Sequence, residues 1–355
     1  MTARCRCVDS VPTRTPRNPR PHAEPSRPEG AVEHAATPDG TDLPPHAIWI
    51  DLANPTAEEA ELVEETTGLR VPSRQALSEV ESSSRLRRLR NGLSLSTPMI
   101  TFDQADSQLK PLGFVLTKDR LITVRFHDLR AYAEVKARLT NGDGPATRSI
   151  EIFLLLMEEL VDSLADALEE MGADLDALST RVFDFDAGAR PGARPGDSRA
   201  PRRRDIALRR ILRSVGRRGK ALGKLRASLL GLQRIVPFVA AECGSFAEGD
   251  ADARFETIQR DIASLDEFET RLTENVQFLL DATLGLINME QNNTFRILTV
   301  VSVVGVPPTL IASMYGMNFK HMPELDWLYG YPYGLALIAT SALVPMIYFK
   351  VKGWF

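Results

Sequence analysis

The sequence predicts an α+β cytoplasmic domain followed by a long stalk helix and two transmembrane helices. Strand-like and helical segments alternate early in the chain, an amphipathic pattern then runs for more than forty residues without a proline, and two uncharged apolar stretches lie near the C-terminal end. With 355 residues the chain is long enough for two domains, and its formal net charge of -4 is too small to indicate a partner.

Residues 1–45 are expected to form a disordered tail, because they are rich in proline, arginine, serine and threonine and have almost no apolar periodicity. No apolar core followed by small residues marks a secretory signal, so the N-terminus is expected to stay in the cytoplasm. Cys5, Cys7 and Cys243 form neither a disulfide framework nor a zinc spacing with histidines, which favours reduced thiols.

A compact α/β domain is expected over residues 46–145. Thr56 begins a helix, and Glu59 three residues later completes a capping-box pattern. Strands are expected around residues 49–52, 92–102, 112–117 and 121–126, followed by a helix over residues 128–140. The domain has no glycine-rich phosphate loop, and no cluster of nucleophile, base and orienting group is visible, so the protein is not expected to be an enzyme.

Residues 146–254 are helical and sharply divided by charge. Residues 151–186 hold eleven acidic residues and one basic residue, whereas residues 199–226 hold twelve basic residues and one acidic residue. The repeat GARPGARPG at residues 188–196 cannot continue a helix between them. This pattern predicts a helical hairpin whose arms attract each other. The basic arm could instead bind nucleic acid or lipid headgroups, but the adjacent acidic arm favours internal pairing, so no nucleic-acid partner is expected.

A stalk helix is expected over residues 255–296. Its apolar residues recur at spacings of three and four, which is typical of an amphipathic helix with a narrow apolar seam. The seam consists of Phe255, Ile258, Ile262, Leu265, Phe268, Leu272, Val276 and Leu279.

The stalk leads into two predicted membrane spans. Residues 297–317 and 328–349 carry no charge, and each run has the roughly 20 apolar residues needed to cross a bilayer. Two buried core helices are the alternative, which the length and proximity of the runs disfavour. Arg296, Lys350 and Lys352 flank the spans, whereas the loop 318–327 is not basic, so both termini are expected in the cytoplasm. A multi-pass protein of the inner (plasma) membrane is therefore expected, with aromatic residues at both interfaces.

The region from residue 287 to residue 355 resembles the C-terminal part of CorA magnesium channels. The resemblance rests on the Y-G-M-N sequence at residues 315–318, the M-P-E-L sequence at residues 322–325 and the basic end at residues 350–355. The rest of the chain has the same order of parts but resembles the family more loosely. The resemblance implies a homopentamer in membrane lipid that takes up Mg²⁺ and also Co²⁺ and Ni²⁺, with the first span around a central pore.

The resemblance implies that Tyr315, Gly316, Met317 and Asn318 form the selectivity filter. Mg²⁺ sheds its water reluctantly, so a ring of Asn318 carbonyl oxygens would accept hydrogen bonds from the waters of the hydrated ion. Gly316 would let the backbone come close to the axis, and a ring of Glu324 in the external loop would attract cations. A simple helix cap at residues 316–318 and a solvated charge at Glu324 are the alternatives.

Helical spacing predicts the residues that line the pore, which are Leu298, Ser302, Val306, Thr309 and Ser313. None of them is a carboxylate. Leu298 and Val306 would form apolar rings that could close the pore by dewetting.

In the family, intracellular metal bound by acidic groups between subunits closes the pore. Asp261 is the best stalk candidate here, and Glu79 and Glu81 are the nearest carboxylates of the α/β domain, since residues 84–93 read SRLRRLRNGL, where the family is often acidic. An exposed stalk charge is the alternative for Asp261. Mg²⁺ is thus expected as the transported ion and as a regulatory ligand.

Two other functions stay open. A zinc transporter of the same superfamily would share the fold, because an asparagine ring does not select among divalent cations by itself. A non-transporting, membrane-anchored coiled-coil scaffold would reduce the signature to a helix cap.

Overall fold

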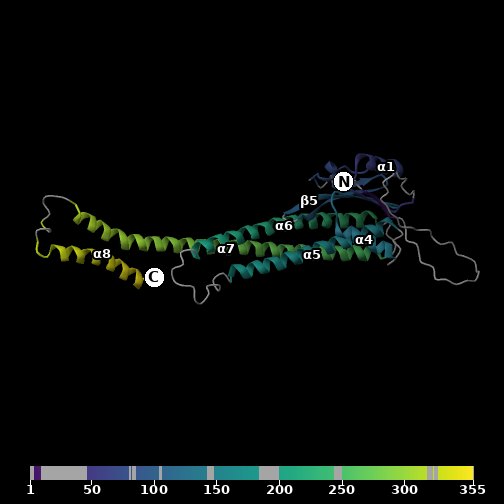
Figure 1. Ribbon diagram of the computed structural model, residues 1–355. Coiled ribbons are helices and arrows are strands. Elements are labelled where there is room, and N and C mark those ends of the chain that lie inside the picture. The colour runs from purple at the N-terminus through teal and green to yellow at the C-terminus, as the bar shows by residue number, and fades with distance from the viewer. Residues whose placement is uncertain are drawn as a thin grey trace, which may run out of the picture. The chain divides into compact units, whose positions relative to one another are not determined.

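The computed structural model describes residues 4–8, 46–79, 81, 85–103, 106–141, 148–183, 200–243, 250–317, 323 and 327–354 (Figure 1). Two compact units divide the chain, one formed by Met1–Thr180 and Ser214–Phe278 and the other by Arg181–Arg213 and Leu279–Phe355. The first unit contains the sheet and the helices packed on it. The second contains the apolar segments that the sequence predicts as membrane spans.

A six-stranded sheet with strand order β1-β2-β6-β5-β4-β3 forms the centre of the first unit. The strands are β1 (Arg4–Val8), β2 (Trp49–Ala53), β3 (Leu86–Leu89), β4 (Gly92–Asp103), β5 (Asp106–Thr117) and β6 (Leu121–Arg125). β2 and β6 are parallel, and the other neighbouring pairs are antiparallel. The four predicted strands are confirmed, and β1, β3 and the first half of β5 extend the sheet beyond them.

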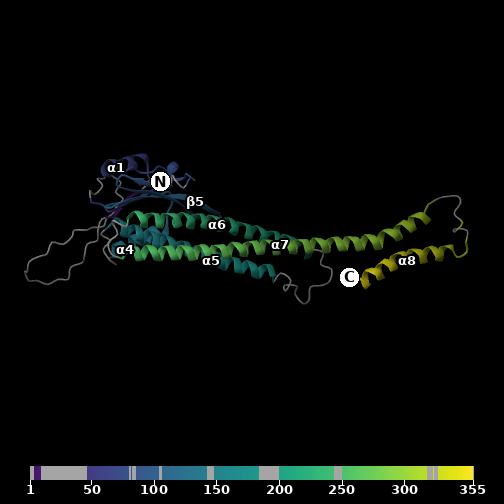
Figure 2. The same cartoon turned by 180° about the vertical axis from the view of Figure 1, so that it is seen from behind.

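One face of the sheet packs against α1 (Ala57–Thr67) and α2 (Arg74–Leu77). Successive side chains of a strand point to opposite faces, and Ile50 and Leu52 of β2 point toward these helices. The predicted capping box at the start of α1 is confirmed, since the Glu59 N–H donates to Thr56 Oγ1 at 3.2 Å and the Thr56 N–H donates to Glu59 Oε2 at 2.8 Å. Figures 1 and 2 show α1 on the side of the sheet away from α5.

Long helices cover the opposite face of the sheet. They are α4 (Arg130–Asn141), α5 (Ser149–Phe183) and α6 (Ala200–Cys243). Phe114 of β5 meets Phe153 of α5 edge to face at 5.7 Å between ring centres. A side chain at Gly231 of α6 would lie 1.9 Å from Thr97 Oγ1, so only glycine allows this close approach of α6 to β4.

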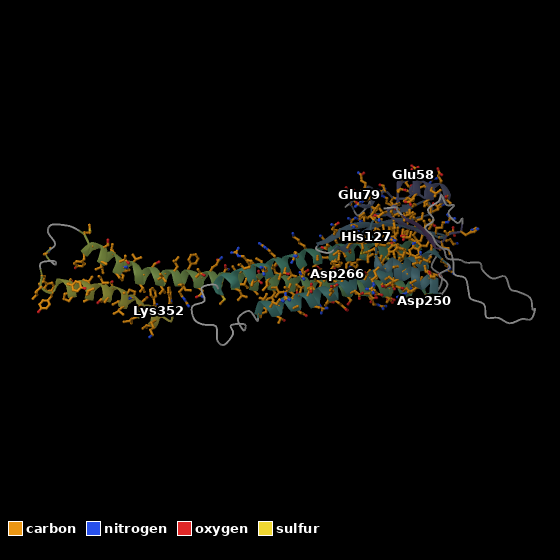
Figure 3. The ribbon with its side chains drawn as sticks, viewed as in Figure 1. Glu58, Glu79, His127, Asp250, Asp266 and Lys352 are labelled. Atoms are coloured by element: carbon orange, nitrogen blue, oxygen red, sulfur yellow. The ribbon has the colours of Figure 1, made fainter. Side chains whose placement is uncertain are left out.

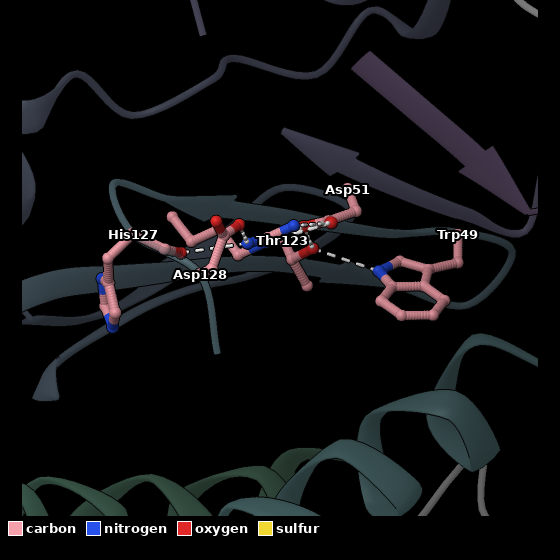
Figure 4. Close-up of polar contacts among 6 residues, drawn as sticks. Trp49, Asp51, Thr123, His127 and Asp128 are labelled. Carbon is pink, nitrogen blue, oxygen red and sulfur yellow. Dashed lines mark hydrogen bonds and ion pairs between the residues drawn. The ribbon is translucent and has the colours of Figure 1, made fainter. Parts of the chain in front are cut away.

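A buried ion pair joins the two parallel strands (Figure 4). Arg125 of β6 donates from Nη2 to Asp51 Oδ2 of β2 at 3.0 Å, and its Nε donates to both carboxylate oxygens at 3.1 Å. Thr123 donates to Asp51 Oδ1 at 2.9 Å and accepts from the Trp49 indole at 3.1 Å. The Arg125 guanidinium also lies 5.1 Å from the centre of the Tyr132 ring. With these contacts the network is structural, since its strongest donors and acceptors are already paired.

His127 lies beside this network and is only 7% exposed, and neither of its ring nitrogens has a hydrogen-bond partner within the described residues. Burial lowers the pKa of His127 from 6.5 to about 4, and the positive charges of Lys110 and Arg125 add to this effect against the attraction of Asp128. The side chain is therefore neutral at physiological pH.

The apolar seam predicted for the stalk is confirmed in α7 (Ala251–Tyr315). Six of its eight residues are buried, whereas Leu265 and Phe268 are half-buried. The helix is continuous through residue 296, so the predicted stalk and the first predicted span belong to one helix.

The charged arms correspond to α5 and α6, and their charges also meet other helices. Arg218 of α6 donates to Asp174 Oδ2 of α5 at 2.7 Å, as a hairpin requires. Arg226 of α6 instead lies 3.3 Å from the buried Glu269 of α7, and Arg254 of α7 makes two bonds of 2.7 and 2.8 Å to Glu158 of α5. The opposed charges therefore meet within a bundle that includes α7, and the hairpin itself stays a prediction, since residues 184–199 between the arms lie outside the described residues.

Residues 4–8 form β1 and pair with β2, inside the segment for which composition predicts disorder. The outer edge of β2 offers unpaired backbone N–H and C=O groups, and pairing with them requires no apolar periodicity. Cys5 and Cys7 lie on this strand. Residues 1–3 and 9–45 lie outside the described residues.

Candidate ion-conduction site

Two described helices have the length and composition of membrane spans. They are α7, with 65 residues, and α8 (Gly330–Val351), with 22 residues. In the most apolar 18-residue window of each helix, 6% of the residues are buried. The core helix of a soluble protein would be mostly buried, so this exposure favours membrane spans over core helices.

The five residues predicted to line the pore lie in the last part of α7, and all are exposed. Leu298 is 61% exposed and Val306 is 62% exposed, and Ser302, Thr309 and Ser313 are exposed as well. The single chain also exposes Val301 and Leu310 on other faces of the helix. Because residues on other faces are exposed as well, exposure does not identify which face of the helix lines the pore, and the pore-lining face stays a prediction.

Pro307 and Pro308 lie inside α7, about two turns before its end. Because proline has no N–H, the carbonyls of Val303 and Val304 lose their normal helical donors. Thr309 donates from Oγ1 to the Gly305 carbonyl at 2.6 Å. The Thr309 hydroxyl oxygen thus keeps its lone pairs and can accept hydrogen bonds from the waters of a hydrated cation.

The helix ends where the Y-G-M-N sequence begins. Tyr315 is the last residue of α7, and the Gly316 N–H donates to the carbonyls of Ala312 at 3.1 Å and Ser313 at 3.2 Å. Gly316 is not among the residues with positive φ, so this end is not a left-handed glycine cap. A side chain at Gly316 would lie 3.3 Å from the Ala312 carbonyl oxygen, a close approach that glycine accommodates best.

Of the remaining filter and loop candidates, Met317 is exposed, and its N–H donates to the Met314 carbonyl at 3.3 Å. Asn318 and Glu324 lie outside the described residues, as does most of the loop 318–327. On the far side of the loop, the Trp327 ring lies 5.8 Å from the Tyr333 ring and 6.2 Å from the Tyr329 ring. These aromatic residues precede or begin α8, where the sequence predicts an interfacial belt.

The structure does not bring the regulatory candidates together within one chain. Glu79 Oε2 lies 3.8 Å from Arg87, and the Glu79 carbonyl accepts from Arg85 Nε at 2.9 Å. Glu81 and Asp261 are exposed. Figure 3 shows Glu79 beside the sheet, whereas Asp266, on the same helix as Asp261, lies among the long helices. Among the described residues, no group of three or more His, Cys, Asp or Glu side chains could hold a metal ion.

Asp162 of α5 is an acidic residue near Asp261 that the sequence does not single out. Burial raises the pKa of Asp162, and repulsion from Asp261, Glu158 and Asp166 adds to this effect against the attraction of Arg138. The spacing of four between residues 158, 162 and 166 places these carboxylates on one helical face, which is a signal visible in the sequence.

The family model described as CorA-like Mg²⁺ transporter protein matches residues 45–351. The chain belongs to the CorA-like Mg²⁺ transporter family. This CorA-family chain is 34% identical over 317 residues to a magnesium transport protein CorA of Haemophilus influenzae, covering 89% of this chain and 94% of the relative. It is 34% identical over 309 residues to the protein of the same name from Pasteurella multocida, covering 87% and 92%. These relatives are named as transport proteins, not as enzymes.

Two solved structures have the same fold as this CorA-family chain. The complete CorA magnesium transporter of Methanocaldococcus jannaschii gives a TM-score of 0.69 at 18% identity, covering 100% of this chain and 99% of the other. The full-length CmaX protein gives 0.63 at 22% identity, covering 92% and 94%. The expected combination of an α+β domain, a long helix and two transmembrane helices is therefore confirmed, and the CorA-family chain is a membrane protein.

Proposed function

We propose that the protein mediates Mg²⁺ uptake as a homopentameric channel, in which the first span of each chain lines a central pore. Family membership supports this proposal, since relatives of similar length are named as magnesium transport proteins. The observation that carries it is the position of the Y-G-M-N sequence. It begins where an apolar, exposed helix ends, so that five copies would bring five Asn318 residues to one mouth of the pore.

Selection in this proposal acts on the hydrated ion. Removal of the octahedral water shell of Mg²⁺ is costly, and the pore face of α7 contains no carboxylate that could replace it. Asn318 carbonyl oxygens and the Thr309 and Ser313 hydroxyl oxygens would accept hydrogen bonds from the bound waters, and the Gly316 carbonyl could join this ring. Leu298 and Val306 would form the apolar gate below it.

The basic residues support an orientation with both termini in the cytoplasm of the inner (plasma) membrane. Arg296 precedes the first span, and Lys350 and Lys352 lie at the end of α8. The loop 318–327 would then face outward, where five Glu324 carboxylates would raise the local concentration of cations.

Regulation by intracellular Mg²⁺ is a separate proposal. Asp261 is exposed on α7, and a second copy would have to supply the other carboxylates, because the described residues of one chain do not assemble a site. Glu79 is the weaker candidate, since its carboxylate already lies 3.8 Å from Arg87, which leaves Glu81 as the other acidic residue of this segment.

Uptake of Mg²⁺, Co²⁺, Ni²⁺ and Zn²⁺ in competition, by proteoliposomes containing the full chain, tests the proposed function. Mg²⁺, Co²⁺ and Ni²⁺ should compete for one pathway, whereas preferred uptake of Zn²⁺ would favour a zinc transporter. Asn318→Ala should abolish Mg²⁺ flux while the pentamer stays assembled, and Asn91→Ala, in an exposed turn between β3 and β4, is the matched control. Flux at the wild-type rate in Asn318→Ala would contradict the asparagine ring, and absence of flux for all four ions would favour a scaffold.

A further inference from the structure

The end of α8 is held in a defined conformation by backbone hydrogen bonds. The Trp354 N–H donates to the Phe349 carbonyl at 3.0 Å, and the Gly353 N–H donates to the Lys350 carbonyl at 3.1 Å. Gly353 has a φ of 69°, in the left-handed region that glycine adopts without strain. These two bonds and this conformation form a Schellman motif, which ends the helix and turns the following residue back onto it.

An aromatic stack completes this motif. The Phe349 and Trp354 rings are 5.2 Å apart with an interplanar angle of 22°, which is the hydrophobic contact expected to accompany a Schellman motif. Phe349 is 6% exposed, whereas Trp354 keeps 37% of its surface exposed. The stack therefore fixes the indole at the helix end and leaves part of it available for contact.

Two lysines surround this stack. The Lys352 ammonium lies 5.8 Å from the centre of the Tyr348 ring, and the spacing of four places these two residues on one face of α8. Lys350, two residues away, points to a different side of the helix. Within the part of the chain that the structure describes, neither lysine forms an ion pair, and α8 contains no Asp or Glu. We call residues 348–354 the C-terminal cap; Figure 3 labels its Lys352.

The length of α8 places the C-terminal cap at the level of lipid headgroups. Its 22 residues extend about 33 Å, close to the roughly 30 Å of a hydrocarbon core. Tyr and Trp are enriched at this level because their rings are amphipathic, and unpaired lysines there meet headgroup phosphates. A soluble acidic partner fits less well, because three of the seven residues of the C-terminal cap are aromatic.

We propose that the C-terminal cap binds anionic phospholipid headgroups. The Lys352 ammonium and the Tyr348 hydroxyl hold one phosphate, Lys350 binds a second lipid, and the stacked Trp354 sets the depth of the helix end. The inference rests on the proposed function only in that α8 crosses the membrane. It does not depend on the transported ion or on the asparagine ring.

The test is the composition of lipid retained by the purified full chain after extraction from vesicles with equal parts of phosphatidylglycerol and phosphatidylcholine. The wild type should retain mainly phosphatidylglycerol. The variant Lys350→Gln with Lys352→Gln should lower the ratio of anionic to neutral lipid by about fivefold per lysine. Lys350→Arg with Lys352→Arg should keep the ratio, and Lys118→Gln, in an exposed turn of the α/β domain, is the control.

Several outcomes would overturn the inference. An equal ratio of anionic to neutral lipid in the wild type and in the glutamine variant would mean that the lysines only offset the helix dipole. In that case, loss of the lysines would lower the melting temperature of the variant equally in neutral and in mixed lipid. If the glutamine variant fails to assemble, the wild type still decides, since its preference for phosphatidylglycerol should weaken as salt rises and a preference independent of salt contradicts the proposal. Retention is measured without Mg²⁺, so a protein that binds anionic lipid but conducts no Mg²⁺ would contradict the proposed function alone.

Discussion

Asp51→Leu should destabilise the first unit strongly, because it leaves the buried guanidinium of Arg125 without its counter-charge. The two residues are 5% and 4% exposed, and three hydrogen bonds of 3.0 to 3.1 Å join their side chains. Burial opposes the charged form of Arg125, yet attraction and hydrogen bonding to Asp51, together with a bond to Asp128, raise its pKa above the usual value. Loss of one partner of such a pair costs about 3–5 kcal/mol.

Removal of both charges should cost less than removal of either one. Asp51→Leu with Arg125→Met eliminates the unpaired charge. The remaining loss comes from three bonds at about 1 kcal/mol each: those of Arg125 to the His127 carbonyl and to Asp128, and that of the Thr123 hydroxyl to Asp51. The double variant should therefore lose about 3 kcal/mol, well below the sum of the two single variants.

Trp49 allows this measurement in the full chain. The sequence has three tryptophans, so Trp327→Phe and Trp354→Phe leave Trp49 as the only one, and its 1% exposure predicts a red shift of emission when the sheet unfolds. Urea unfolding in detergent gives the free energy of unfolding for each variant. Glu256→Gln is the control, because its pair with Arg260 is 2.9 Å long but exposed and should contribute less than about 1 kcal/mol. Additive costs of the two single variants, or a cost of Asp51→Leu no larger than that of Glu256→Gln, would refute the reasoning.

Three further predictions concern pH, helix pairing and gating. The pKa of His127 falls from 6.5 to about 4 on folding, so its contribution to the free energy of unfolding is complete above pH 6.5 and is lost as the pH falls toward 4. In urea unfolding, the free energy of unfolding of His127→Leu should therefore fall less over this range than that of the wild type, by at most about 1.4 kcal/mol per pH unit. Cysteines in place of Asp174 and Arg218, with the three native cysteines replaced by serine, should cross-link within one chain, and links only between chains would contradict this pairing. Asp261→Ala should shift inhibition of Mg²⁺ current by internal Mg²⁺ to higher concentrations without changing selectivity, whereas identical inhibition curves would mean that Asp261 is only a solvated charge.

Local features of the sequence determined much of this protein. Charge-free runs of about 20 residues specify membrane spans because partitioning into lipid depends on composition over a short window. The capping box at Thr56 and the apolar seam of α7 were readable for a similar reason, since both join residues within one or two helical turns. The Y-G-M-N and M-P-E-L sequences carried the family resemblance without any knowledge of the fold.

The tertiary structure alone decided which charged residues meet. Asp51 and Arg125 are separated by 74 residues and become neighbours only because β2 and β6 pair in parallel. Glu269 is buried against Arg226 of another helix, although the sequence around it reads as an exposed polar face. Asp162 likewise has its pKa raised mainly by burial between helices, and repulsion from Asp261 of α7 adds to this effect. Strand order and helix packing determine which charged side chains become neighbours. The energy of a buried charge then depends on the side chains that lie within a few ångströms of it.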